Sequence, residues 1–318
     1  MKRIAAAIFA LCTTTALAQS YPSKPIRVIV PYAPGGTSDI LSRAIGPKLT
    51  EAWGQPVIVE NKPGANGNVG AEFVAKSPPD GYTVLLADIG ALCISPSVYP
   101  KLPFDPAKDF APVVMVSYSP HVLAVHPSVP VSNVKELVDY ARARPGAMNF
   151  AVSGTGGAPH LAGIEFAQRT GVQWTYVPYK GGSQAVADVV AGQSNILFNG
   201  MLATYPFVKG GKLKALAVSS AKRMAAAPDL PTVAEQGLPG FETGSWQGVV
   251  AAADTPRDAV RKLNAEFVRV LNTPEMKERL ASQGTEVRAG TPEQFGEFIR
   301  SEITRWAKVV KDSGARFD

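Results

Sequence analysis

The chain has 318 residues, of which 46% are hydrophobic and 18% charged. This composition excludes an intrinsically disordered chain, and the length favours two domains because one domain usually has ~100–200 residues. No uncharged apolar run reaches the roughly 20 residues of a membrane-spanning helix, which excludes an integral membrane protein. The formal net charge of +6 comes from scattered basic residues, so no nucleic-acid partner is expected.

The first 18 residues are typical of a secretory signal peptide. Lys2 and Arg3 form a basic start, residues 4–12 are apolar, and the small-residue triplet that ends at Ala18 is a cleavage site. We therefore predict cleavage after Ala18 and a periplasmic mature protein. Cleavage leaves Cys93 as the only cysteine, so no intramolecular disulfide can form. The histidines lack metal-ligand spacing, and no metal or cofactor is expected.

Strand and helix patterns alternate in the first part of the mature chain. Residues 26–30 are a β-branched run that prolines stop, and Ser38 is a plausible N-cap for a helix that follows. Strands are predicted at residues 57–59 and 82–87, with a helix at 69–75 between them. Such alternation predicts an α/β fold with a largely parallel sheet.

The same order of elements restarts near the middle of the chain. Residues 148–152 read as a strand, residues 153–157 as a glycine loop, and Pro159 opens a helix. We therefore predict two similar α/β domains. The last third contains three Thr-Pro pairs, at 255–256, 273–274 and 291–292, each predicting a helix with threonine as its cap.

Two glycine loops are the main candidates for a binding site. A strand that ends in glycines and leads into a helix presents unpaired N–H groups and the positive end of the helix dipole, which suits an anion. Neither loop has the spacing of a nucleotide-binding motif. The candidate residues are Pro34, Gly35, Gly36, Thr37, Ser38 and Asp39 in the first loop, and Ser153, Gly154, Thr155, Gly156 and Gly157 in the second.

Other polar residues adjoin these loops or other predicted strand ends. Asp39 either stabilises its helix dipole or receives a ligand group, and His160 either donates to an anion or packs. Further candidate ligand contacts are Tyr32, Asp88, Ser183 and Asn199. No serine-nucleophile elbow is present, so an enzyme is not expected.

The ordered motifs of the mature chain resemble a known family, the extracytoplasmic solute receptors of tripartite tricarboxylate transporters, also called Bug-type receptors. The motifs that carry the resemblance are residues 29–39 (IVPYAPGGTSD), 59–65 (VENKPGA), 79–82 (PDGY), 102–110 (LPFDPAKDF), 160–161 (HL), 177–182 (VPYKGG) and 228–232 (PDLPT). One departure is Ala158, where serine is common in the family, and its loss removes a possible donor from the second loop.

The resemblance implies an α/β, two-lobed periplasmic-binding-protein fold of the Venus-flytrap, type II-like kind, each lobe a mostly parallel sheet flanked by helices. We expect lobe 1 to comprise residues 19–120 plus 251–318 and lobe 2 residues 121–250. The resemblance also implies a non-catalytic receptor whose glycine loops grip a small carboxylate from opposite lobes and which serves the membrane permease subunits of a tripartite tricarboxylate transporter. We expect the protein to be a monomer.

The ligand's identity stays open at this point. A di- or tricarboxylate or an aromatic carboxylate is expected rather than a sugar, metal or peptide, but the residues do not choose between aliphatic and aromatic acids. An exported enzyme that acts on a carboxylate, and a sensor that signals to a membrane protein, remain the alternatives.

Overall fold

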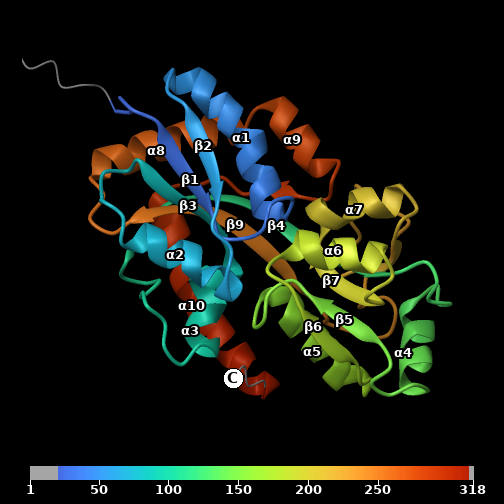
Figure 1. Ribbon diagram of the computed structural model, residues 1–318. Coiled ribbons are helices and arrows are strands. Elements are labelled where there is room, and N and C mark those ends of the chain that lie inside the picture. The colour runs from blue at the N-terminus through green and yellow to red at the C-terminus, as the bar shows by residue number, and fades with distance from the viewer. Residues whose placement is uncertain (1–20, 315–318) are drawn as a thin grey trace, which may run out of the picture.

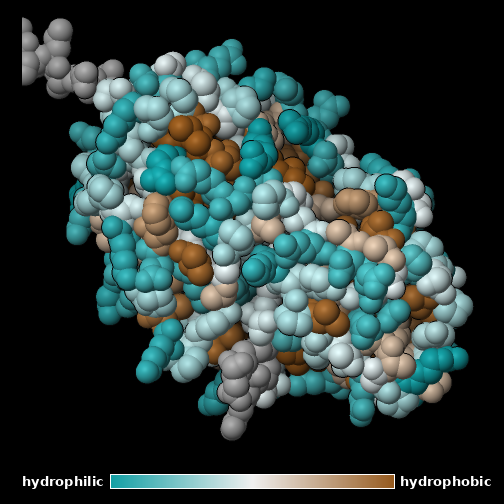
Figure 2. Space-filling model, in the orientation of Figure 1, coloured by the Kyte–Doolittle hydropathy of each residue, from teal (hydrophilic) through white to brown (hydrophobic). Residues whose placement is uncertain are grey.

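Strands and helices alternate along most of the chain in Figure 1, a computed structural model that describes residues 21–314. The predicted signal peptide, residues 1–18, and its cleavage site lie outside the described residues. None of the described helices has the length and apolar character needed to cross a membrane. On the face drawn in Figure 2, hydrophobic side chains form separate patches among hydrophilic ones.

Three parallel strands form one half of the sheet, which we call the first half. β1 lies between β2 and β3, and both pairings are parallel. The helices that link these strands pack on them and on the segment that follows β3. The elements are β1 (Ile26–Val30), α1 (Thr37–Trp53), β2 (Val57–Asn61), η1 (Ala65–Gly67), α2 (Asn68–Ala75), β3 (Thr83–Asp88), η2 (Gly90–Ile94) and α3 (Ser95–Val98).

The second half of the sheet repeats this arrangement. β5 pairs in parallel with both β6 and β7, and a helix follows each of the three strands. The elements are α4 (Val134–Arg142), β5 (Asn149–Val152), α5 (Ala158–Thr170), β6 (Thr175–Pro178), α6 (Gly182–Val190), β7 (Ile196–Gly200), α7 (Met201–Lys209) and β8 (Lys214–Val218). The predicted α/β fold with a strand, a glycine loop and a helix in each half is therefore confirmed.

Two strands cross from one half to the other. β4 (Phe110–Val125) pairs with β9 (Gly244–Ala252) along its first part and with β7 and β8 along its last part, while β9 also pairs with β3. All of these pairings are antiparallel. The sheet therefore runs without a break in the order β2-β1-β3-β9-β4-β7-β5-β6, with β8 and the short β10 (Glu286–Val287) on β4.

The C-terminal helices return to the first half. α8 (Arg257–Leu271) packs on α1 and β4, α9 (Pro274–Ala281) on β10, and α10 (Pro292–Ser313) on η2, α3 and β4. Phe295 and Trp306 of α10 share a buried core with Ile29 of β1 and Leu85 of β3. Burying such side chains stabilises the fold by about 1.5–3 kcal/mol each. The expected lobe boundaries, at residues 120 and 250, stay a prediction.

The side chains expected to cap helices do so at some positions but not at others. Thr273 and Thr291 accept backbone N–H groups at the starts of α9 and α10, as predicted. Thr255 does not cap α8, which begins after Pro256, because its hydroxyl donates instead to the Ala252 carbonyl at 2.7 Å. Ser38 is not the cap of α1 either: the extended residue Gly36 is, so that Thr37 and Ser38 both lie in the first turn.

Candidate ligand-binding site

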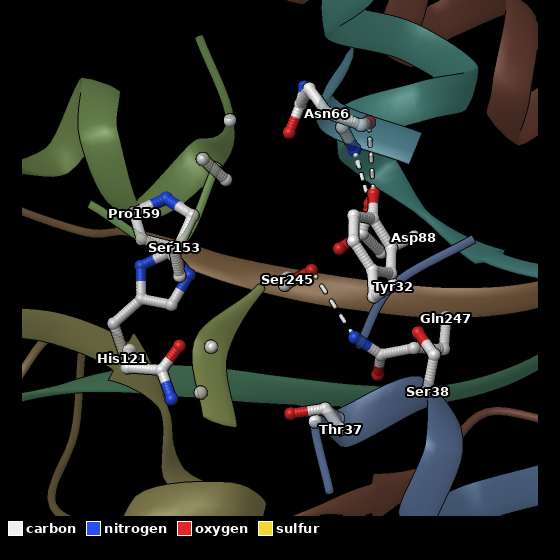
Figure 3. A pocket seen from close by; sticks show the side chains of 17 residues that line it. Tyr32, Thr37, Ser38, Asn66, Asp88, His121, Ser153, Pro159, Ser245 and Gln247 are labelled. Carbon is white, nitrogen blue, oxygen red and sulfur yellow. Dashed lines mark hydrogen bonds between the residues drawn. The ribbon is translucent and has the colours of Figure 1, made fainter. Parts of the chain in front are cut away.

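A cavity of about 50 Å³ lies between the two halves of the sheet, next to the crossing strands (Figure 3). Loops from both halves contribute to its wall. The lining residues are Tyr32, Gly36, Thr37, Ser38, Asn66, Asp88, Gly90, His121, Ser153, Gly157, Ala158, Pro159, Gly182, Asn199, Gly200, Ser245 and Gln247.

The starts of α1 and α5 reach this cavity from opposite halves. The first helical bond of α1 is from Ile40 to Gly36, and the first of α5 is from Leu161 to Gly157. The N–H groups that precede these bonds, those of Thr37, Ser38 and Ala158 among them, have no acceptor within their helix. With the positive helix dipole ends, they form a site suited to an anion. The backbone of Ala158 thus lines the cavity although the expected serine hydroxyl is missing.

The starts of two further helices line the same cavity. Gly182, the first residue of α6, and Gly200, the N-cap of α7, are both in its wall. The glycine motifs of the sequence indicated two helix starts, whereas the fold brings together four. The carboxyl ends of parallel strands meet at one edge of a sheet, which explains why the helices that follow β1, β5, β6 and β7 begin there.

Asp39 shapes the first loop and does not line the cavity. Its carboxylate accepts the Gly35 N–H at 2.9 Å, Arg43 Nε at 3.0 Å and Asn61 Nδ2 at 2.9 Å. Burial acts to raise the pKa of Asp39, but the donors from Arg43, Gly35 and Asn61 outweigh it and leave that pKa below its usual range. An ionised Asp39 therefore holds Gly35 in its left-handed conformation, at φ +82°.

His160 acts on the second loop in the same way. Its Nδ1 accepts the Gly156 N–H at 3.0 Å, and its ring lies edge-on to Tyr176 with centroids 4.8 Å apart. Burial lowers the pKa of His160 to about 4, so the ring is neutral at physiological pH. Nδ1 can accept this bond only if the ring proton is on Nε2.

The predicted site residues fall into two groups in the structure. One group lines the cavity: Tyr32, Gly36, Thr37, Ser38, Asp88, Ser153, Gly157 and Asn199. The other group is not in its wall: Pro34, Gly35, Asp39, Gly154, Thr155, Gly156, His160 and Ser183.

Several members of the second group lie in the seam where the halves meet. The Tyr99 hydroxyl donates to the Thr155 carbonyl at 3.3 Å. A Cβ added to Gly156 would lie 2.5 Å from Val98 Cγ1, and one added to Gly154 would lie 2.7 Å from Asn66 Oδ1. The glycines therefore allow the two halves to approach closely around the cavity.

The residues that form the cavity floor were not indicated by any sequence motif. His121 on β4 and Ser245 and Gln247 on β9 come from the crossing strands, and Gln247 Nε2 donates to Ser245 Oγ at 3.3 Å. His121 is fully buried, and its Nδ1 lies 3.1 Å from Thr243 Oγ1. Burial lowers the pKa of His121 to about 3, which keeps this histidine neutral. A histidine directly before the apolar run at residues 122–125 was the available signal.

Two buried polar atoms at the cavity lack a hydrogen-bond partner. They are Nε2 of His121 and Nδ2 of Asn66, a residue in the left-handed conformation at φ 53°. Buried polar groups are nearly always paired in folded proteins, so these two indicate groups that await a ligand or water. Asn66 directly follows the motif at residues 59–65, but nothing local in the sequence indicated which way its amide would point.

The fold and this site define a class: periplasmic solute-binding proteins, in which a small ligand is held between two α/β halves joined by crossing strands. Residues 41–315 match the family described as "Tripartite tricarboxylate transporter family receptor". The chain belongs to this family, and the two-lobed fold expected from the resemblance is confirmed. Members of the family are solute-binding receptors, not enzymes.

Similar proteins cover almost the whole chain. Protein BugT of Bordetella pertussis is 37% identical over 300 residues, which is 94% of this chain and 92% of BugT. The solved structure of "R. palustris Rpa4515 with adipate" has a TM-score of 0.90 at 37% identity and covers 92% of this chain and 98% of that one. MatC from Rhodopseudomonas palustris "with bound malate" has a TM-score of 0.87 at 32% identity, with 91% and 100% covered.

Proposed function

We propose that this protein is an exported receptor that captures a small carboxylate between its two halves and delivers it to the membrane permease of a tripartite tricarboxylate transporter. The observation that carries the proposal is the meeting of the α1 and α5 starts, one from each half, at a single cavity. One carboxylate there accepts N–H groups from both halves, so binding favours the closed form.

The residues that line the cavity favour capture of an anion by backbone groups. None of its lining residues is a lysine or an arginine. An anion in this cavity is therefore held by N–H groups, hydroxyls and helix dipoles, which suits a small ligand that must be released again. Adipate and malate, the acids in two similar structures, belong to the same chemical class.

Delivery to a permease follows from the family and from the predicted export. Cleavage after Ala18 would release the receptor into the periplasm, where its closed form would present both halves to the membrane subunits as a monomer. Uptake of labelled ligand by cells that lack the receptor gene tests this step. Wild-type receptor should restore uptake, and ligand binding without any effect on uptake would contradict the transport role.

The binding step is tested by thermal unfolding of the mature protein with carboxylic acids, sugars and amino acids. Ligand at a hundred times its dissociation constant should stabilise the folded state by ~2.7 kcal/mol. Scattering in solution should show a smaller radius of gyration with the same ligand, because the halves close. Stabilisation by a neutral sugar, with no response to any acid, would overturn the proposal.

A further inference from the structure

Asp88 is the single charged side chain among the residues that line the cavity. Its Oδ1 accepts both the Tyr32 hydroxyl at 2.5 Å and the Gly90 N–H at 2.8 Å. Burial and the neighbouring carboxylate raise the pKa of Tyr32 well above its usual value, so Tyr32 keeps its proton and donates it. Burial raises the pKa of Asp88 above its usual value, whereas the Tyr32 hydroxyl and the Gly90 N–H, both bonded to Oδ1, act to lower that pKa and favour the carboxylate.

This carboxylate makes the cavity electrostatically uneven. Figure 3 shows Asp88, Tyr32 and Asn66 on one side, with Ser153 and Pro159 from the second half across from them. The helix starts attract an anion, but the Asp88 side offers a negative charge and no cation to offset a second ligand carboxylate. Like charges brought together in a site from which water is excluded repel strongly.

The Asp88 side also holds an unused donor. Asn66 Nδ2 is buried without a partner, while Asn66 Oδ1 faces the second glycine loop. A Cβ placed on Gly90 would lie 2.9 Å from Asp88 Oδ1, 3.2 Å from Asn66 Nδ2 and 3.2 Å from the Tyr32 hydroxyl. An acceptor, a donor and a hydroxyl therefore surround one point in the cavity wall.

We propose that the cavity selects a carboxylate whose far end is a neutral group, such as a carboxamide, that donates a hydrogen bond to Asp88 and accepts one from Asn66. A dicarboxylate of the same length cannot donate to Asp88 and places a second negative charge beside it. This inference rests on the proposed function, because it assumes that the first carboxylate is held by the helix starts. This preference would distinguish the receptor from the similar proteins whose structures contain the diacids adipate and malate.

The test compares each diacid with its own monoamide in calorimetric titrations of the mature protein at pH 7.5. The pairs are succinate and succinamate, glutarate and glutaramate, and adipate and adipamate. For the length that fits, the monoamide should bind at least ten-fold more tightly than its diacid. A diacid that binds as tightly as its monoamide, or more tightly, at every length would overturn the inference but leave the proposed function standing. If none of these six compounds binds while another carboxylic acid stabilises the protein in thermal unfolding, the inference fails and the proposed function stands; no response to any acid contradicts both.

Two variants connect the preference to the named side chains. Asp88→Asn keeps an oxygen for Tyr32 and Gly90 but removes the charge, so the preference for the monoamide should fall at least ten-fold. Asn66→Gly removes the amide while keeping the left-handed backbone, and it should weaken monoamide binding three- to ten-fold. Asp139→Asn on the surface of α4, where Asp139 pairs with Lys135, is the control for net charge. An equal effect of Asp88→Asn and Asp139→Asn on the preference would overturn the assignment of Asp88.

Discussion

Asp39 and His160 are equivalent residues at the two opposed helix starts. Each is the third residue of its helix, and each accepts the N–H of the residue just before the N-cap, Gly35 at 2.9 Å and Gly156 at 3.0 Å. Gln184 repeats the bond at the start of α6 by accepting the Lys180 N–H at 3.0 Å. Because these side chains are used to brace the loops, the ligand is left with the backbone N–H groups and the hydroxyls.

The first prediction concerns this brace in the second loop. His160→Ala should weaken ligand binding about three- to ten-fold, because a net hydrogen bond contributes ~0.5–1.5 kcal/mol and the loop loses its set conformation. His160→Asn offers a side-chain oxygen near the same place, as Asp39 does in the first loop, and should recover most of the affinity. Calorimetric titration measures both, and equal affinities for the alanine variant and wild type would show that the brace has no bearing on binding.

The second prediction concerns the seam between the halves. Gly156→Ala should abolish closure and binding, because its Cβ would lie 2.5 Å from Val98 Cγ1. Gly146→Ala is the matched control: its φ of +74° is close to the +75° of Gly156, but nothing lies within 4 Å of its added Cβ. Both substitutions carry the ~1–2 kcal/mol cost of a left-handed alanine.

Small-angle scattering with ligand separates the clash with Val98 from the cost of a left-handed alanine. Gly146→Ala should still become more compact, whereas Gly156→Ala should not. The double variant Gly156→Ala with Val98→Ala should regain closure, because the clashing methyl groups are gone. Closure of the Gly156→Ala variant with wild-type affinity would mean that the seam tolerates the added methyl group.

The third prediction concerns stability in acid. Burial lowers the pKa of His121 to about 3 and that of His160 to about 4, from a usual value of 6.5. Below pH 6.5 the unfolded chain therefore binds protons that the folded chain does not, and the free energy of unfolding should fall by about 1.4 kcal/mol per pH unit for each histidine until its folded pKa is reached.

Asp39 adds to this loss at lower pH. The pKa of Asp39 in the folded protein lies below the usual 3.8. Its contribution to the free energy of unfolding is therefore present above pH 3.8 and is lost as the pH falls through the folded pKa. Urea unfolding at pH 7, 6 and 5 measures the histidine part above the range in which Asp39 titrates. His160→Asn should reduce the slope, and a slope that stays unchanged would indicate that His160 is not held neutral in the folded state.

The fourth prediction concerns processing. Exported protein should begin at Gln19, because the small-residue site ends at Ala18. Intact-mass measurement of periplasmic protein checks this directly. A lipid-modified or unprocessed N-terminus would contradict it.

The sequence by itself determined the local parts of the site. The strand at residues 26–30 with its stopping prolines, the glycines of both loops and the helix behind each loop are short-range features, because strand propensity, positive φ and helix initiation depend on neighbouring residues. Their repetition in both halves was sufficient to predict two α/β units and an anion site at the helix starts. The exact first residue of a helix was less certain, as Ser38 and Thr255 show.

Only the tertiary structure decided which side chains face the ligand cavity. Asn66, His121 and Gln247 lie in three separate segments that meet because β4 and β9 cross between the halves. Asp39 and His160 were candidates by position, but the turn into each helix directs their side chains back to the loop N–H groups. Local sequence preferences set backbone conformation within a few residues, whereas the approach of distant side chains depends on how the whole sheet packs and closes.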